Sequence, residues 1–166
     1  MKTHTLAILL ALAAGAVSAQ TAATVEVKDA WARATVPGQM ATGAFMTLTA
    51  RDGAKLVAVS SPVAGVAEVH AMKMDGGVMT MRAVQGGLAL PAGTPVALKP
   101  GGFHVMLMDL KAPLQKDSTV ALTLVFQDAK GVETKTVLQL PVATLAPGGA
   151  VPMGHGQGTH PGHAKP

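Results

Sequence analysis

Apolar and polar positions alternate along most of the chain in short runs, the pattern expected of strands that bury one face. The stretch 24–28 alternates in this way, and so does 30–34. After residue 20, no stretch has the sustained 3.6-residue period of a long amphipathic helix. The pattern predicts strands over 24–28, 30–34, 43–50, 55–60, 67–74, 78–84, 94–98, 103–109, 119–126 and 133–140.

Turn residues separate these runs. Asp75-Gly76-Gly77 lies between two of them and predicts a tight hairpin, and 128–131 predicts a second hairpin near the end of the chain. Many short strands with turn signals at intervals of about ten residues indicate an all-β sandwich or barrel. Because no connection is long and periodic enough to be a crossover helix, a parallel α/β sheet is disfavoured.

The first 19 residues differ from the rest and predict a signal peptide. Lys2 gives a positive start, the apolar run 6–17 is too short to cross a bilayer comfortably, and Val17-Ser18-Ala19 has the small residues of a cleavage site. We therefore expect an exported protein whose mature chain begins at Gln20. The alternative, an uncleaved anchor helix, is disfavoured by the short apolar run.

The other end of the chain also changes composition. Residues 146–166 contain six Gly and four Pro and almost no apolar side chains to bury. Such a segment cannot offset the entropy of ordering, so a disordered tail is expected. This leaves one domain over 20–145.

Charge and cysteine content narrow the possible functions. The chain has 13 basic and 9 acidic side chains, and its net charge of +4 falls to +3 without residues 1–19. That charge is too small and too scattered for a nucleic-acid surface. After the signal, no apolar run is long enough to span a membrane. There is no cysteine, so neither a disulfide nor a thiolate ligand is available.

Soft metal-ligating side chains are concentrated in two segments, 68–81 and 103–108, which hold six of the ten methionines. Residues i and i+2 of a strand share a face, so His70 shares one with Met72 and Met74. By the same rule, Met79 and Met81 share a face beyond the hairpin turn.

The second segment repeats the pattern. His104 shares a face with Met106 and Met108, opposite an expected core face. The expected core residues are Phe103, Val105 and Leu107. A single methionine is more often core packing than a ligand. Two His-x-Met pairs in a chain with few histidines favour a metal site over packing.

Thioethers and imidazoles are neutral, soft ligands, which suit Cu(I). Zinc favours cysteine or carboxylate ligands, and calcium needs clustered oxygens. A blue-copper site needs a cysteine thiolate, which is absent. In an oxidising compartment thiols tend to form disulfides, whereas thioethers persist as ligands.

The spacing His70-x10-Met81-x22-His104-x-Met106 closely resembles the copper motif of the PCuAC family of periplasmic copper chaperones. The resemblance covers about residues 24–142. Further matching segments are 29–33, 43–46, 90–93, 98–102 and 104–108.

This resemblance implies a cupredoxin-like Greek-key β-sandwich in the periplasm that binds Cu(I) through His70, Met81, His104 and Met106. It also implies delivery of copper to the CuA site in subunit II of cytochrome c oxidase, alone or with a Sco-type copper chaperone. Apart from the resemblance, the other methionines are candidates for secondary sulfur ligands, a docking surface or simple packing: Met72, Met74, Met79 and Met108.

Some members of that family carry a His- and Met-rich extension that helps to bind Cu(II). The tail of this chain is similar in kind, although its spacing is not a fixed motif. Its candidate ligands are Met153, His155, His160 and His163. The alternative is a solubilising low-complexity end.

The sequence leaves three alternative functions to compare with a copper chaperone. An enzyme is disfavoured because there is no tyrosine for a radical cofactor, no G-x-S-x-G motif and no histidine at the predicted mature terminus. An exported β-sandwich interaction domain would use the methionine face as a dry interface. A periplasmic copper storage or resistance protein would share the copper site and differ only in loading no acceptor.

Overall fold

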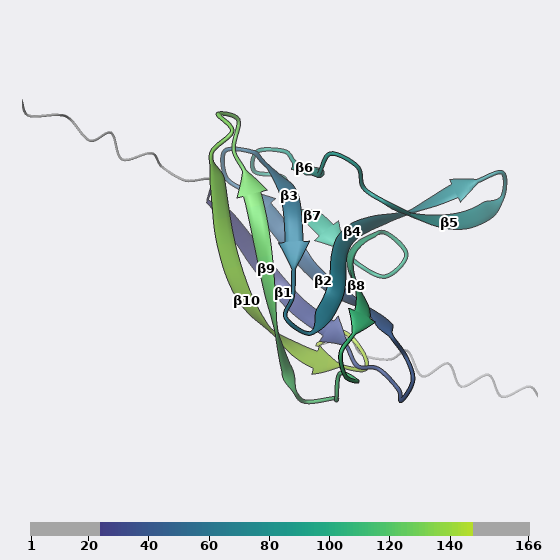
Figure 1. Ribbon diagram of the computed structural model, residues 1–166. Coiled ribbons are helices and arrows are strands. Elements are labelled where there is room, and N and C mark those ends of the chain that lie inside the picture. Colours follow the sequence, from purple (N-terminus) through teal and green to yellow (C-terminus); the bar gives the residue numbers. More distant parts are fainter. Residues whose placement is uncertain (1–23, 148–166) are drawn as a thin grey trace, which may run out of the picture.

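The computed structural model describes residues 24–147, which form ten strands and no helix (Figure 1). The strands are β1 (Val25–Arg33), β2 (Ala41–Ala50), β3 (Ala54–Ser60), β4 (Ala64–Asp75), β5 (Val78–Ala83), β6 (Leu88–Leu90), β7 (Val96–Leu98), β8 (Phe103–Leu110), β9 (Thr119–Gln127) and β10 (Glu133–Ala143). The prediction of an all-β fold is confirmed.

The strands follow one another in the order β5-β4-β8-β7-β2-β1-β10-β9-β3-β6 and fold into two layers. Most pairs are antiparallel, as short turns allow. The first and last strands run parallel and join the layers, with Ala32 opposite Val142.

The hydrophobic core lies between the layers. One layer contributes Leu48 and Leu107, and the other contributes Leu122 and Phe126, all fully buried. These residues sit at alternate positions of their strands, so the period-2 pattern of the sequence marks the core face directly.

Two elements differ from the sequence prediction. The runs 24–28 and 30–34 form one strand, β1, which is interrupted by a bulge at Asp29, where φ is 52°. A bulge adds one residue and resets the alternation, so the pattern reads as two strands. The short strand β6 is absent from the predicted strands, because Pro91-Ala92-Gly93 follows it directly.

The β4–β5 hairpin projects from the body of the sandwich (Figure 1). Its turn is the predicted one: Gly76 and Gly77 both have positive φ, and Asp75 lies opposite Val78. Strand β5 pairs only with β4, which makes it an edge strand.

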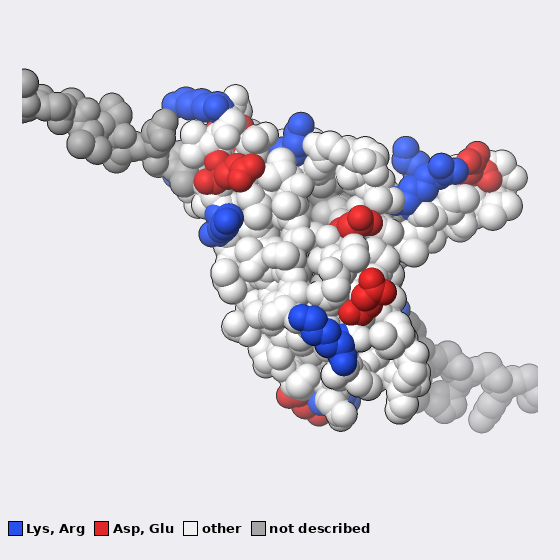
Figure 2. Space-filling model, viewed as in Figure 1, with Lys and Arg blue, Asp and Glu red and all other residues white. Residues whose placement is uncertain are grey.

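Charged side chains are scattered over the face shown in Figure 2, with basic and acidic groups close together on the projecting hairpin. On that hairpin, Arg82 lies 3.9 Å from Asp75. Residues 24–147 contain no helix that is both long and apolar enough to cross a membrane. The predicted signal peptide (1–19) and nearly all of the predicted tail (146–166) lie outside the described residues.

Candidate metal centre

The strand register brings the two histidine segments together. His70 on β4 lies directly opposite His104 on β8, and Met72 on β4 lies opposite Met81 on β5. Directly opposed side chains on one face of an antiparallel pair are in contact range. Met106 lies opposite Glu68, so all of these residues share one face of the three neighbouring strands.

A cavity of about 210 Å³ opens on this face. Its lining includes four of the predicted metal-site or secondary residues. The lining residues are Arg33, Gly43, Phe45, Met72, Met81, Pro100, Gly101, His104 and Met106. Two other hollows in the described residues, of about 270 Å³ between β3 and β4 and about 550 Å³ beside residues 128–131, have no histidine or methionine in their linings.

The ring of His104 is buried and its orientation is fixed by the backbone. Nδ1 lies 3.0 Å from the carbonyl oxygen of Gly102. Because a carbonyl can only accept, Nδ1 carries the hydrogen and donates it, which leaves a lone pair on Nε2 of the neutral ring. Nε2 faces the sulfur of Met81 at 3.2 Å. A thioether has no hydrogen to give, so two lone pairs face each other, as in a pair of ligands that share a cation.

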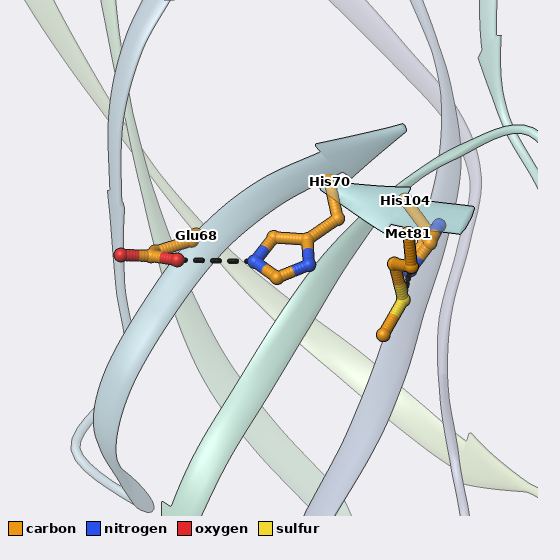
Figure 3. Close-up of polar contacts among 4 residues, drawn as sticks. All are labelled: Glu68, His70, Met81 and His104. Atoms are coloured by element: carbon orange, nitrogen blue, oxygen red, sulfur yellow. Dashed lines mark hydrogen bonds and ion pairs between the residues drawn. The ribbon is translucent and has the colours of Figure 1, made fainter. Parts of the chain in front are cut away.

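His70 is held in the complementary way. Its Nε2 lies 3.0 Å from Oε2 of Glu68, and a carboxylate accepts, so Nε2 donates (Figure 3). Nδ1 is buried and has no hydrogen-bond partner among the described residues. In Figure 3 this nitrogen lies on the side of the ring toward His104 and Met81, and the two histidine rings are 6.1 Å apart between centroids. A buried lone pair without a partner is costly, and a metal ion would satisfy it.

The methionines of the site differ in exposure. Met81 is 47% exposed, whereas Met72 and Met106 are half-buried. Met108 lies further along β8, opposite Val66, and does not line the cavity. Met74 and Met79 lie further out on the hairpin and face each other directly.

The expected core face of β8 is only partly correct. Val105 and Leu107 are fully buried, but Phe103 is 37% exposed. It is the first residue of the strand, next to the loop Lys99–Gly102. Burial therefore follows strand parity within β8 but not at its first residue.

Five residues of the cavity wall have no role assigned from the sequence, and three of them, Arg33, Gly43 and Phe45, form its aromatic part. The guanidinium carbon of Arg33 lies 5.3 Å from the ring centroid of Phe45, which in turn lies 4.8 Å from that of Trp31. A Cβ on Gly43 would come within 2.7 Å of the Phe45 ring, so glycine makes room for the aromatic wall. All three lie in the segments 29–33 and 43–46 that carry the family resemblance, but nothing in those segments indicates metal chemistry.

Residues 24–147 contain no cluster of three or more His, Asp, Glu or Cys side chains that could hold a metal ion. Any site in this region therefore depends on thioethers as well as imidazoles, and this donor set fits Cu(I). The candidate tail ligands Met153, His155, His160 and His163 lie outside the described residues.

Comparison with known proteins identifies the family. A family model described as "Putative lipoprotein LpqE-like" matches residues 25–142. The relative "Putative lipoprotein Lxx21020" of Leifsonia xyli is 38% identical over 130 residues, which cover 74% of this chain and 78% of that protein. Protein RP573 of Rickettsia prowazekii is 32% identical over 130 residues, which cover 75% of this chain and 70% of that protein.

Solved structures agree on the fold. The solution structure of CuI-DR1885 from Deinococcus radiodurans is 29% identical with a TM-score of 0.56, and covers 80% of this chain and 85% of that one. The apo PCuAC domain from PmoF1 is 25% identical with a TM-score of 0.57, and the match covers 73% of this chain and 94% of that domain. The chain therefore belongs to the LpqE-like family, and its β-sandwich is the cupredoxin-like fold of PCuAC domains.

Proposed function

We propose that the protein is a copper chaperone that binds one Cu(I) ion through His70, Met81, His104 and Met106. The observation that carries this proposal is the lone pair on Nε2 of His104, which faces the Met81 sulfur at 3.2 Å. The unpartnered Nδ1 of His70 supports it. The similarity to DR1885, which was solved with Cu(I), supports the choice of metal.

The ligand set suits an ion that is cargo rather than a resident cofactor. All four ligands are neutral, so the bound ion keeps its own +1 charge. Met81 is 47% exposed on an edge strand, so a ligand from an acceptor protein can approach the site beside Met81. Stepwise ligand exchange then requires no unfolding of the sandwich.

The proposed acceptor is the CuA site of cytochrome c oxidase subunit II, loaded directly or together with a Sco-type copper chaperone. The proposed compartment is the periplasm. Lipoprotein names among the relatives support export. The sequence contains no cysteine, the residue that would carry a lipid, so we propose export without proposing lipidation. For the tail, we propose Cu(II) binding through the histidines at 155, 160 and 163.

The test is Cu(I) affinity measured by competition with bicinchoninate. The double substitution Met81→Leu and Met106→Leu keeps side-chain size but removes two sulfurs, and it is expected to weaken binding by at least about a hundredfold. Met108→Leu is the matched control, because Met108 is on the same strand outside the cavity. Unchanged affinity in the double variant would contradict the ligand assignment.

A storage protein would bind the same ion. The additional methionines at positions 72, 74 and 79 are the observation that favours this second candidate function. The two functions differ in transfer. Mixing the Cu(I)-loaded protein with an apo CuA domain is expected to load that domain if the protein is a chaperone. If copper stays on the protein although the acceptor binds it more tightly, storage is the better description.

A further inference from the structure

The β4–β5 hairpin carries four methionines on a single face. Met72 lies opposite Met81, and two residues closer to the turn Met74 lies opposite Met79. Strand parity places all four on the same side of the ribbon. The inner pair lines the metal cavity, whereas the outer pair lies beyond it toward the tip.

The turn geometry brings the members of each pair close together. In a two-residue hairpin the closing residues, here Asp75 and Val78, exchange backbone hydrogen bonds. Pairs alternate along the ladder, so Met74–Met79 and Met72–Met81 are both of the non-hydrogen-bonded kind. Their Cα atoms are then about 4.5 Å apart and their side chains are at their closest.

The outer pair has no packing role in the described structure. Met74 is 66% exposed and Met79 is 49% exposed, and neither belongs to the hydrophobic core. Charged residues of the hairpin occupy the other face: Lys73 lies opposite Thr80, and Arg82 lies opposite Ala71. Neither of these two cations therefore shares the methionine face of the hairpin, and Arg33 of β1 lines the cavity beside the inner pair.

We propose that Met74 and Met79 form an outer Cu(I) site that passes the ion to and from the inner His/Met site. This inference rests on the proposed function for its direction, but the sulfur pair binds Cu(I) in its own right. The two pairs are separated by two residues, or about 7 Å along the strand. One step between them, with flexible thioether side chains, covers that distance.

The transfer is a ligand exchange. Bonds from copper to the sulfurs of Met74 and Met79 break as bonds to the sulfur of Met81 and to Nε2 of His104 form. Copper remains Cu(I), so no electron is exchanged. Thioethers carry no proton to release, and Nε2 is the His104 nitrogen that does not donate to the Gly102 carbonyl.

The first experiment follows the methionine methyl groups of the full chain by NMR during a Cu(I) titration under reducing conditions. The first equivalent is expected to shift the Met81 and Met106 methyls. Excess Cu(I) is expected to shift those of Met74 and Met79, while the exposed Met40, outside the hairpin, stays unchanged. If the Met74 and Met79 signals do not move with several equivalents of Cu(I), the outer site is wrong.

The second experiment measures the rate of Cu(I) uptake from its bicinchoninate complex. The double variant Met74→Leu/Met79→Leu is expected to bind the first equivalent with unchanged affinity. Its uptake is expected to be about tenfold slower, because it lacks a tethered ligand pair that raises the local copper concentration. Met40→Leu is the control and is expected to match the unsubstituted protein. An unchanged rate in the double variant would overturn the transfer role.

The His104→Ala variant separates the two proposals. It is expected to lose the tight first equivalent, yet its Met74 and Met79 methyls should still shift with Cu(I). Loss of both responses in a variant that retains its β-sheet circular dichroism would overturn an independent outer site. If the unsubstituted protein shows no tight site but the outer methyls shift, the proposed function fails and the outer site stands.

Discussion

At the scale of single residues, the hydrogen-bond partners of the two histidines decide which nitrogens can bind metal. The Gly102 carbonyl fixes the hydrogen of His104 on Nδ1, and the Glu68 carboxylate fixes that of His70 on Nε2. The available nitrogens are therefore Nε2 of one ring and Nδ1 of the other. Such partners orient metal-ligating imidazoles and raise their basicity.

Glu68→Ala is expected to weaken Cu(I) binding by about 10- to 100-fold, because the His70 ring loses the group that sets its tautomer. Glu68→Gln keeps an acceptor oxygen and should retain most of the affinity. Bicinchoninate competition measures both. Glu26→Ala is the control, because it removes an exposed carboxylate that pairs with Lys28 instead. Equal affinities for Glu68→Ala and this control would argue against the positioning role.

Strand parity placed the candidate ligands on common faces, and the family resemblance selected four of them, but neither indicated the cavity wall. Alternation places His70 with Met72, and His104 with Met106, on common faces. The aromatic wall is different, because Phe45 and Arg33 reach the site only through the pairing of β2 with β8 and of β1 with β2. Register between strands distant in sequence depends on the whole sheet, so local patterning does not determine it.

At the scale of elements, the β4–β5 hairpin positions Met81, and its turn depends on glycine. Gly77 has a φ of 83°, and a Cβ there would meet no atom within 4 Å, so any cost of substitution is backbone strain alone. Gly77→Ala is expected to destabilise the hairpin by about 1–2 kcal/mol. Gly77→Asn is expected to cost less, since asparagine tolerates this conformation.

Hydrogen exchange at the amides of β5 measures this effect. Faster exchange is expected for Gly77→Ala than for Gly77→Asn, while the amides of β9 stay unchanged because the hairpin pairs only through β4. Identical β5 exchange in the alanine variant and the unsubstituted protein would show that the turn is not strained. A change in amide exchange across β9 as large as that in β5 would show that the hairpin does not open independently of the sandwich.

The strands themselves were largely predictable, and the two exceptions have local causes. The bulge at Asp29 splits one strand into two apparent runs, and a proline directly after Leu90 hides the short β6. The hairpin turn was predictable because consecutive glycines favour a turn in which two residues have positive φ.

At the scale of the whole molecule, binding of Cu(I) should stabilise the sandwich. The site joins β4, β5 and β8, so an unfolded chain does not offer the same four ligands together. With free Cu(I) at a hundred times the dissociation constant, the expected gain is about 2.7 kcal/mol. Thermal unfolding under reducing conditions, with and without buffered Cu(I), measures it.

The Met81→Leu/Met106→Leu variant is the control for this stabilisation. Its melting temperature is expected to respond little to Cu(I), although its apo form should unfold near the unsubstituted protein because leucine replaces methionine at similar volume. A Cu(I)-dependent rise of equal size in this variant would place the stabilising copper elsewhere in the chain.

The parallel pairing of β1 with β10 has a consequence for the order of folding. Ala32 must find Val142 before the two layers are joined, so this contact spans nearly the whole domain. Contacts between distant positions slow folding, and all-β sandwiches accordingly fold in roughly milliseconds to seconds. A chain that leaves a ribosome or a translocation pore N-terminus first cannot close its sandwich until its last strand has emerged. The join between the first and last strands thus delays hydrogen bonding between the two layers until β10 is available, whereas β4, β5 and β8, which carry the candidate ligands, all precede it in the chain.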